Sequence, residues 1–66
     1  MIRINGENYK IENKKLTLYD LLKGKGIDPQ LAVVEYNGNI APREGYTEIV
    51  LKSGDCLEVI HFVGGG

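Results

Sequence analysis

A chain of 66 residues, 42% of them apolar, is long enough for one small domain and too apolar for a disordered segment of its charge. Eight Lys and Arg residues against nine Asp and Glu residues give a formal charge of −1, without the basic excess of a nucleic-acid-binding protein. One cysteine and one histidine exclude an internal disulfide and a zinc site. No apolar run reaches the length of a membrane span and no secretory signal opens the sequence, so we expect a cytoplasmic protein.

The first segment predicts a β-hairpin. Residues 2–5 alternate apolar and polar side chains, which is typical of a half-buried strand. Asn5 and Gly6 both tolerate a positive φ, and an Asn-Gly pair is a strong signal for a two-residue hairpin turn. The return strand then carries Tyr9 and Ile11.

The next segment predicts the main helix, from Thr17 to about residue 23. Thr17 is suited to cap the first turn, and Asp20 stands where a capping box places its acid. Leu16 before the cap and Leu21 in the second turn form a hydrophobic staple. Glycines after residue 23 end the helix. The stripe expected to face a sheet consists of Leu18, Leu21 and Leu22.

Further β segments follow in the second half. Residues 31–36 are apolar and β-branched, an Asn-Gly pair at 37–38 repeats the hairpin signal, and a brief return ends before Pro42. Residues 47–51 are β-prone but short. Residues 56–63 give the longest strand signal in the chain and follow directly after a turn.

The order of these segments predicts an α+β fold, in which a mixed four- or five-stranded sheet packs on one main helix. We expect the first hairpin and the last strand to be neighbours, with the helix across one face. The folded domain is expected over residues 1–63, followed by a flexible glycine tail over residues 64–66. We expect the free protein to be a monomer.

The three glycines at the end of the sequence are its most distinctive feature. Because glycine has no Cβ atom, Gly64, Gly65 and Gly66 can enter a channel too narrow for other residues, and together they extend roughly 10 Å at about 3.3–3.6 Å per residue. The Gly66 carboxylate is then free of steric cover. Taken alone, such glycines are explained equally well by a frayed end or an expression remnant.

The whole sequence resembles the ubiquitin-like (β-grasp) sulfur carriers, and within them the ThiS family of thiamine biosynthesis. The order and spacing of the matching pieces are more specific than any one of them. These pieces are Asn5-Gly6-Glu7, Thr17-Leu18-Tyr19-Asp20-Leu21-Leu22, Ala32-Val33, Asn37-Gly38, Ile40-Ala41-Pro42-Arg43-Glu44, Gly54-Asp55, Glu58-Val59-Ile60 and Val63-Gly64-Gly65-Gly66.

The resemblance implies a carrier protein and not an enzyme. In that family a ThiF-like adenylating enzyme uses ATP to activate the terminal glycine carboxylate, here that of Gly66. Sulfur from a donor such as a cysteine desulfurase persulfide relay then gives a thiocarboxylate, which a ThiG-like thiazole synthase consumes. The sequence itself contains no GxxxxGK[ST] or GxGxxG phosphate-binding pattern, so activation has to come from a partner, and no bound cofactor or metal is expected.

Three other interpretations share the fold. The small subunit of molybdopterin synthase is also a β-grasp carrier with a Gly-Gly thiocarboxylate. A ubiquitin-like modifier would instead join its terminal glycine to target lysines. An RNA-binding β-grasp module would show a basic face with aromatic platforms, which four scattered tyrosines and a negative net charge do not provide.

The remaining chemically active residues have simpler explanations. Cys56 opens a strand without an obvious neighbouring base, so we expect a small packing residue. His61 is expected to be a partly exposed structural residue. Asp55 and Glu58 are expected in a turn and on a solvated strand face, because acid–base catalysis needs a pocket. Arg43 is equally suited to pairing with an acidic partner surface or to stabilising its own turn.

The last strand predicts a docking surface. One alternating set of its side chains should face the helix, and the other should lie exposed beside the tail. An exposed apolar patch on so small a protein usually marks an interaction site, although neighbouring strands or a dimer could cover it. We assign Ile60 and Phe62 to this patch as partner-binding residues.

Overall fold

The computed structural model describes residues 1–12 and 15–62. Its elements, in chain order, are strand β1 (Ile2–Ile4), strand β2 (Glu7–Tyr9), helix α1 (Leu18–Gly24), the 3-10 turn η1 (Pro29–Leu31), strand β3 (Ala32–Tyr36), strand β4 (Asn39–Ile40), the 3-10 turn η2 (Arg43–Gly45) and strand β5 (Cys56–His61).

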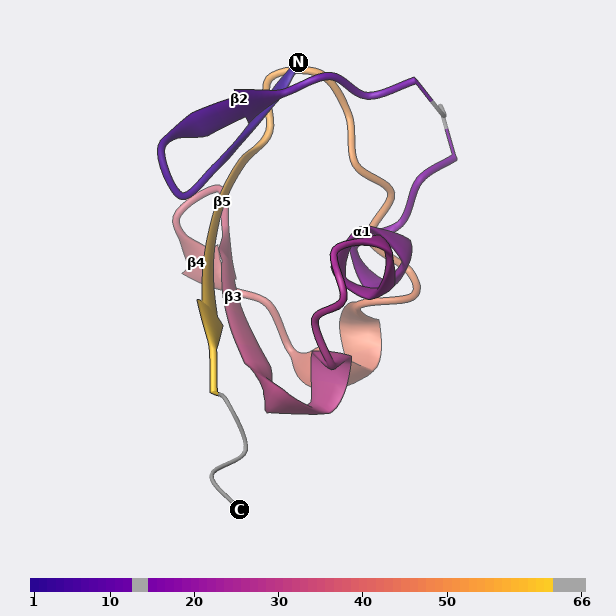
Figure 1. Cartoon of the computed structure of the whole chain (residues 1–66), viewed down its shortest axis with the longest axis vertical. Helices are drawn as coiled ribbons and strands as arrows, with labels where there is room; N and C mark the ends of the chain where they lie inside the picture. Colours follow the sequence, from indigo (N-terminus) through magenta and orange to yellow (C-terminus); the bar gives the residue numbers. More distant parts are fainter. Residues whose placement is uncertain (13–14, 63–66) are drawn as a thin grey trace.

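The five strands form one sheet in the order β2-β1-β5-β3-β4. Strand β5 lies at the centre, parallel to β1 and antiparallel to β3, while the two hairpin pairs are antiparallel. Figure 1 shows the sheet nearly edge-on along one side and α1 on the other, with β5 ending far from the N-terminus. The expected α+β fold with a mixed sheet on one helix is confirmed, and so is the pairing of the first hairpin with the last strand.

Both Asn-Gly pairs form the predicted hairpin turns. Asn5 and Gly6 have φ of 51° and 84°, and Asn37 and Gly38 have φ of 49° and 91°. These positive values suit a two-residue turn whose twist matches that of the flanking strands. The first return strand is shorter than expected, since β2 ends at Tyr9 and does not include Ile11.

Helix α1 begins directly after Thr17, as predicted. The Thr17 Oγ1 accepts a hydrogen bond from the Asp20 backbone N–H at 3.1 Å, which satisfies one of the free donors of the first turn. The stripe is narrower than expected. Leu18 and Leu22, one helical turn apart, are fully buried, whereas Leu21 is only half-buried at the edge of the stripe.

Residues 47–51 do not add a strand to the sheet. This segment turns toward the start of the helix, where the Leu18 N–H donates to Ile49 O at 2.8 Å and the Leu51 N–H donates to Leu16 O at 2.8 Å. A single β-bridge joins Thr17 to Val50. The β-prone residues 47–51 therefore form an extended connection that covers one end of the core.

The core lies between the sheet and α1. It combines the inward residues of the strands with those of the helix and of the 41–51 connection. Its buried members are Ile2, Ile4, Leu18, Leu22, Ala32, Val34, Ala41, Tyr46, Leu51 and Leu57. Tyr46 is the largest side chain among them, and its hydroxyl donates to Ala32 O at 2.9 Å, so its one polar atom is satisfied inside the core.

Truncation of the helix stripe tests this packing. Leu22→Ala should lower the free energy of unfolding by about 2–5 kcal/mol, because it removes a fully buried side chain and leaves a cavity. Leu21→Ala is the matched control and should cost clearly less, since Leu21 is half-buried. Urea denaturation followed by circular dichroism measures both. Equal losses in the two variants would contradict the placement of the stripe.

Candidate functional site

Strand β5 directs its side chains alternately to the core and to the opposite surface of the sheet. Leu57 is fully buried, whereas Cys56, Glu58 and Ile60 are exposed. We call the surface turned away from α1 the outer face. Register places Glu58 opposite Glu35 on β3 and Ile60 opposite Val33, so these side chains share that face.

The apolar part of the outer face lies toward the end of β5. Ile60 is 58% exposed and Phe62, which continues the alternation, is 56% exposed. The Phe62 N–H donates to Leu31 O at 2.9 Å, which extends the ladder beyond β5. Ile40 on the edge strand β4 is 65% exposed. The predicted exposure of Ile60 and Phe62 is confirmed, and we call Val33, Ile40, Ile60 and Phe62 the apolar patch.

A groove opens at the edge of this patch. It has a volume of about 200 Å³ and is lined by Val33, Ile40, Ala41, Pro42, Arg43 and Tyr46. Two of these residues, Val33 and Ile40, belong to the apolar patch, so the groove continues the patch around the edge of the sheet toward η2. Arg43, predicted from the sequence as a partner-binding residue, is exposed at this groove, and its side chain makes no ion pair within residues 1–12 and 15–62.

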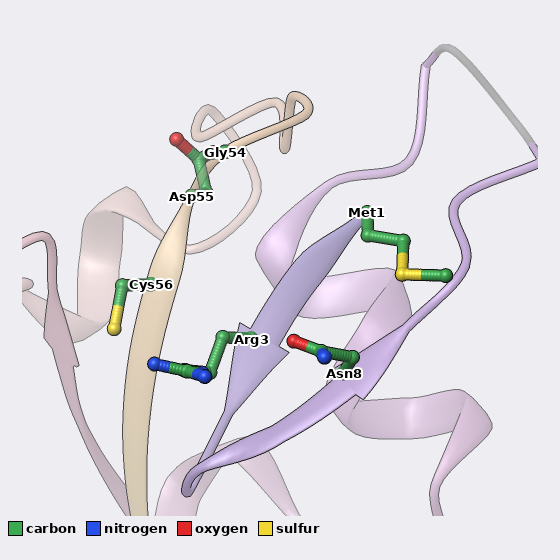
Figure 2. Close-up of a pocket in the computed structure, with 6 residues that line it drawn as sticks. All are labelled: Met1, Arg3, Asn8, Gly54, Asp55 and Cys56. Atoms are coloured by element: carbon green, nitrogen blue, oxygen red, sulfur yellow. The ribbon is translucent and has the colours of Figure 1, made fainter.

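The other end of the outer face is polar. Asn8, Arg3 and Cys56 occupy one row across β2, β1 and β5, and they line a second cavity of about 260 Å³. Figure 2 shows Arg3 extending toward β5 in the direction of Cys56, with Asn8 on its other side and the Asp55 carboxylate directed away. Asp55 is the one carboxylate that lines this cavity, but its oxygens are bonded to Tyr36, Asn37 and Lys52, so it is not positioned to activate the Cys56 thiol.

Two residues next to each other in sequence differ from the expectation. Cys56 is exposed and is not a packing residue, because Leu57 takes the inward position at the start of β5. Asp55 is only 3% exposed and does not lie in a solvated turn. Glu58 is exposed on the strand face as predicted, and His61 is exposed at the end of β5.

Asp55 is the centre of a buried polar cluster. Its Oδ2 accepts hydrogen bonds from the Tyr36 hydroxyl at 2.8 Å and from the Lys52 backbone N–H at 2.9 Å. Its Oδ1 accepts from Asn37 Nδ2 at 3.1 Å and lies 3.4 Å from Lys52 Nζ. One carboxylate thus joins the second hairpin turn, the 52–55 turn and the start of β5.

The electrostatics of this cluster favour the charged carboxylate. Burial by itself raises the pKa of Asp55, but the hydrogen bonds from Lys52, Asn37 and Tyr36 outweigh it and hold this pKa below its ordinary value of 3.8. Burial and the bond to Asp55 raise the pKa of the Tyr36 phenol. The sequence offers no signal for this cluster, because residues 18 or 19 positions apart supply its bonds from the hairpin.

Gly64, Gly65 and Gly66, to which the sequence assigns the chemistry, lie outside the described residues. Within residues 1–12 and 15–62 there is no cluster of three or more His, Cys, Asp and Glu side chains able to hold a metal ion. In the same part of the chain, no helix has the length and apolarity to cross a membrane.

A mixed five-stranded sheet that packs on one helix, with an exposed apolar patch beside the end of its central strand, defines the class of ubiquitin-like β-grasp proteins. The model of the ThiS family matches residues 2–66, and the chain belongs to this family. It is a sulfur carrier of thiamine biosynthesis and not an enzyme.

Individual relatives agree with this assignment. The chain is 36% identical to the sulfur carrier protein ThiS of Bacillus subtilis (strain 168), and the alignment covers all of both sequences. The crystal structure of the thiamine biosynthesis protein ThiS from Geobacter metallireducens superimposes with a TM-score of 0.79 at 28% identity, covering 98% of this chain and 97% of that one.

A further relative is a larger protein. Over 65 residues the chain is 42% identical to a thiazole synthase of Magnetococcus marinus, and the match covers 98% of this chain. A thiazole synthase of Paramagnetospirillum magneticum matches at 36% identity over 96% of the chain. The chain spans only about a fifth of the length of these two relatives.

The buried carboxylate makes stability depend on pH. Asp55→Ala should lower the free energy of unfolding by about 1–3 kcal/mol at neutral pH, because it leaves buried donors without an acceptor. A carboxyl with a lowered pKa stabilises the fold above its unfolded pKa, and this contribution is lost as pH falls through the folded value. The difference between wild type and variant should therefore shrink below about pH 3.8.

Thermal unfolding of wild type and Asp55→Ala between about pH 2 and about pH 7 measures the difference in their free energy of unfolding. This range extends to both sides of the pKa of an ordinary Asp carboxyl. Lys52→Met is the control, because it removes the ion pair but keeps the backbone bond. Its effect should be small, since the Lys52 side chain is 73% exposed and its charge is screened by solvent. A constant difference between wild type and Asp55→Ala at every pH would contradict the assignment.

Proposed function

We propose that this chain carries sulfur, in the cytoplasm, as a thiocarboxylate on the carboxyl group of Gly66. A partner adenylating enzyme uses ATP to convert the carboxylate into an acyl-adenylate, with release of pyrophosphate. The outer sulfur of a donor persulfide then displaces AMP to give an acyl disulfide, and a thiol cleaves its S–S bond to leave the thiocarboxylate and a disulfide. The thiocarboxylate supplies sulfur for the thiazole of thiamine. The chain binds no cofactor of its own.

The full-length match with a named sulfur carrier is the observation that carries this proposal. Because the alignment with the Bacillus subtilis protein runs over the whole of both sequences, it includes the glycines at 64–66. The activation step has a simple physical reason. A carboxylate is a poor electrophile, and joining it to AMP supplies a good leaving group. Gly64 and Gly65 contribute reach and clearance, since a chain without Cβ atoms passes through a narrow channel.

The same comparisons and the outer face support the choice of partners. In two relatives the homologous region forms about a fifth of a chain named thiazole synthase, which supports a working relation between this domain and that enzyme. The apolar patch offers an adenylating enzyme a surface beside the end of β5. Ile60 and Phe62 are more than half exposed there, and exposed apolar groups gain most when a partner covers them.

Shortening the glycine run tests the reacting group. Deletion of Gly66 should leave the melting temperature unchanged, because the buried core of residues 1–12 and 15–62 runs from Ile2 to Leu57. Thiocarboxylate formation should nevertheless collapse, since the carboxylate is drawn back by one residue, roughly 3.5 Å. Gly65→Val should be similarly harmful because its Cβ atom obstructs the channel. The assay mixes each protein with ATP, adenylating enzyme and sulfur donor, and reads the intact mass.

Cys56→Ser is the control and should retain most of the conversion, because the Asp55 carboxylate in the same cavity is bonded to Tyr36, Asn37 and Lys52 and does not activate the exposed thiol. The wild-type protein should gain the mass difference between sulfur and oxygen. Normal conversion of the Gly66 deletion, or loss of conversion in folded Cys56→Ser, would contradict the proposal. Isopeptide adducts on lysines in place of a thiocarboxylate would identify a protein modifier.

The apolar patch has its own test. Phe62→Ala should weaken binding to the adenylating enzyme by ~2 kcal/mol, as expected for an aromatic anchor, without lowering the melting temperature. Tyr19→Ala is the matched control, because it truncates an exposed aromatic side chain on α1, across the molecule from the outer face. Titration calorimetry measures both. Unchanged affinity together with a large loss of thermal stability would place Phe62 in the core instead.

A further inference from the structure

We propose that the groove beside η2 is the socket for an apolar side chain of the thiazole synthase, and that a carboxylate next to this side chain pairs with Arg43. This inference rests on the proposed function, which supplies the enzyme. The size of the groove, the residues that line it and the absence of an ion pair at Arg43 within the described chain indicate which side chains it binds.

The size of the groove favours a side chain over a free small molecule. Ligand pockets for small molecules usually measure about 300–1,000 Å³ and enclose most of the ligand. The groove measures about 200 Å³ and opens onto the outer face. A space of this size takes one aliphatic or aromatic side chain, which is the usual form of an anchor residue in a protein interface.

The lining of the groove accepts an apolar group. The Tyr46 hydroxyl is engaged with Ala32 O at 2.9 Å, and the Ala41 N–H donates to Val34 O at 2.9 Å. The Pro42 carbonyl accepts from the Gly45 N–H at 2.9 Å, and proline itself has no N–H. A polar side chain in the groove would find these groups already bonded, whereas an apolar side chain loses nothing there.

Arg43 adds a charge requirement. Its backbone carbonyl accepts from the Tyr46 N–H at 3.2 Å, but its guanidinium forms no ion pair with the part of the chain that the structure describes. A guanidinium presents donors in a planar fork that a carboxylate matches with two parallel bonds. The complementary group on the partner is therefore an Asp or Glu side chain beside the apolar anchor.

The groove overlaps the apolar patch. Val33 and Ile40 line the groove and also belong to the patch, and Val33 lies opposite Ile60 in the sheet. A synthase seated on the groove therefore covers part of the surface proposed above for the adenylating enzyme, so the two enzymes bind the domain in turn. The anchor and the carboxylate then set the orientation in which the enzyme holds the domain.

Charge reversal at the groove tests the proposal. Arg43→Glu should weaken binding to thiazole synthase at least tenfold, and Arg43→Lys should recover only part of the loss, because an ammonium group lacks the fork. The melting temperatures should match wild type, since the Arg43 side chain is exposed. The effect of Arg43→Glu should also shrink as ionic strength rises. Titration calorimetry or biolayer interferometry with purified thiazole synthase measures these affinities.

Arg3→Glu is the matched control. It makes the same change of charge at an exposed residue of β1, in the cavity at the opposite end of the sheet, and it should change the affinity less than threefold. An Arg43→Glu protein that binds as tightly as wild type, or a control that loses as much, overturns the proposal. So does an effect on self-association alone in analytical ultracentrifugation, which would assign the groove to a second copy of the chain.

A second variant tests the socket itself. Ile40→Ala removes one wall of the groove on the edge strand, where the side chain is 65% exposed, and it should weaken binding about as much as Arg43→Glu. Thiocarboxylate formation by the wild-type protein is measured in parallel. If wild type is not converted, the proposed function fails. If wild type is converted and binds the synthase but both variants bind equally well, only the socket is wrong.

Discussion

The structure depends on the way its central strand is held between two asparagine side chains. Asn5 Oδ1 accepts from the Val59 N–H at 2.7 Å on the β1 side, and Asn37 Oδ1 accepts from the Cys56 N–H at 2.8 Å on the β3 side. Each asparagine also has the positive φ of its hairpin turn. Each asparagine therefore forms the turn of its own hairpin and also binds β5, the strand that lies between the two hairpins.

The register of β5 decides which side chains are core and which are surface. A slip by one residue would turn Glu58 and Ile60 inward and expose Leu57. The two asparagines resist such a slip, and Asp55 resists it further, because its carboxylate accepts bonds from the hairpin and from the 52–55 turn at once. A buried charge is tolerable only with such partners, so the cluster permits one register and disfavours the others.

Features with local causes could be predicted from the sequence, and those with distant causes could not. The Asn-Gly turns and the Thr17 cap depend on neighbours within a few residues, and the structure confirms them. The exposure of Ile60 and Phe62 followed from simple alternation along one strand. The composition did not decide which face is exposed, because both alternating sets are largely apolar toward the end of this strand.

The departures at Asp55, in the 47–51 segment and at the groove involve contacts between segments far apart in the chain. Burial of Asp55 depends on Tyr36 and Asn37, and burial of Tyr46 depends on a carbonyl acceptor at Ala32. The 47–51 segment looks like a strand because it is extended, but its partners are residues 16–18 rather than the sheet. The groove at Arg43 likewise forms only where the edge strand β4 and η2 lie side by side. No spacing of residues in the sequence predicts this contact.

The two faces of the sheet differ in content: the inner face holds the stabilising contacts, and the outer face carries the surfaces proposed above for recognition. The inner face and the Asp55 cluster hold the buried side chains and the satisfied polar groups. The outer face carries exposed apolar residues, an Arg43 guanidinium without an ion pair in the described chain, and Glu35 directly opposite Glu58. A cross-strand pair of like charges and an uncovered apolar patch do nothing to stabilise an isolated domain.

This division has a physical basis in the strand itself. Successive side chains of β5 point to opposite sides, so a change at Ile60 leaves the packing of Leu57 intact. A domain with a single thin core has no second layer in which to build an enclosed active site. A carrier does not need such a site if, as proposed above, partner enzymes supply the chemistry. The packed inner face then has one task, which is to hold the sheet rigid so that partners can bind the outer face.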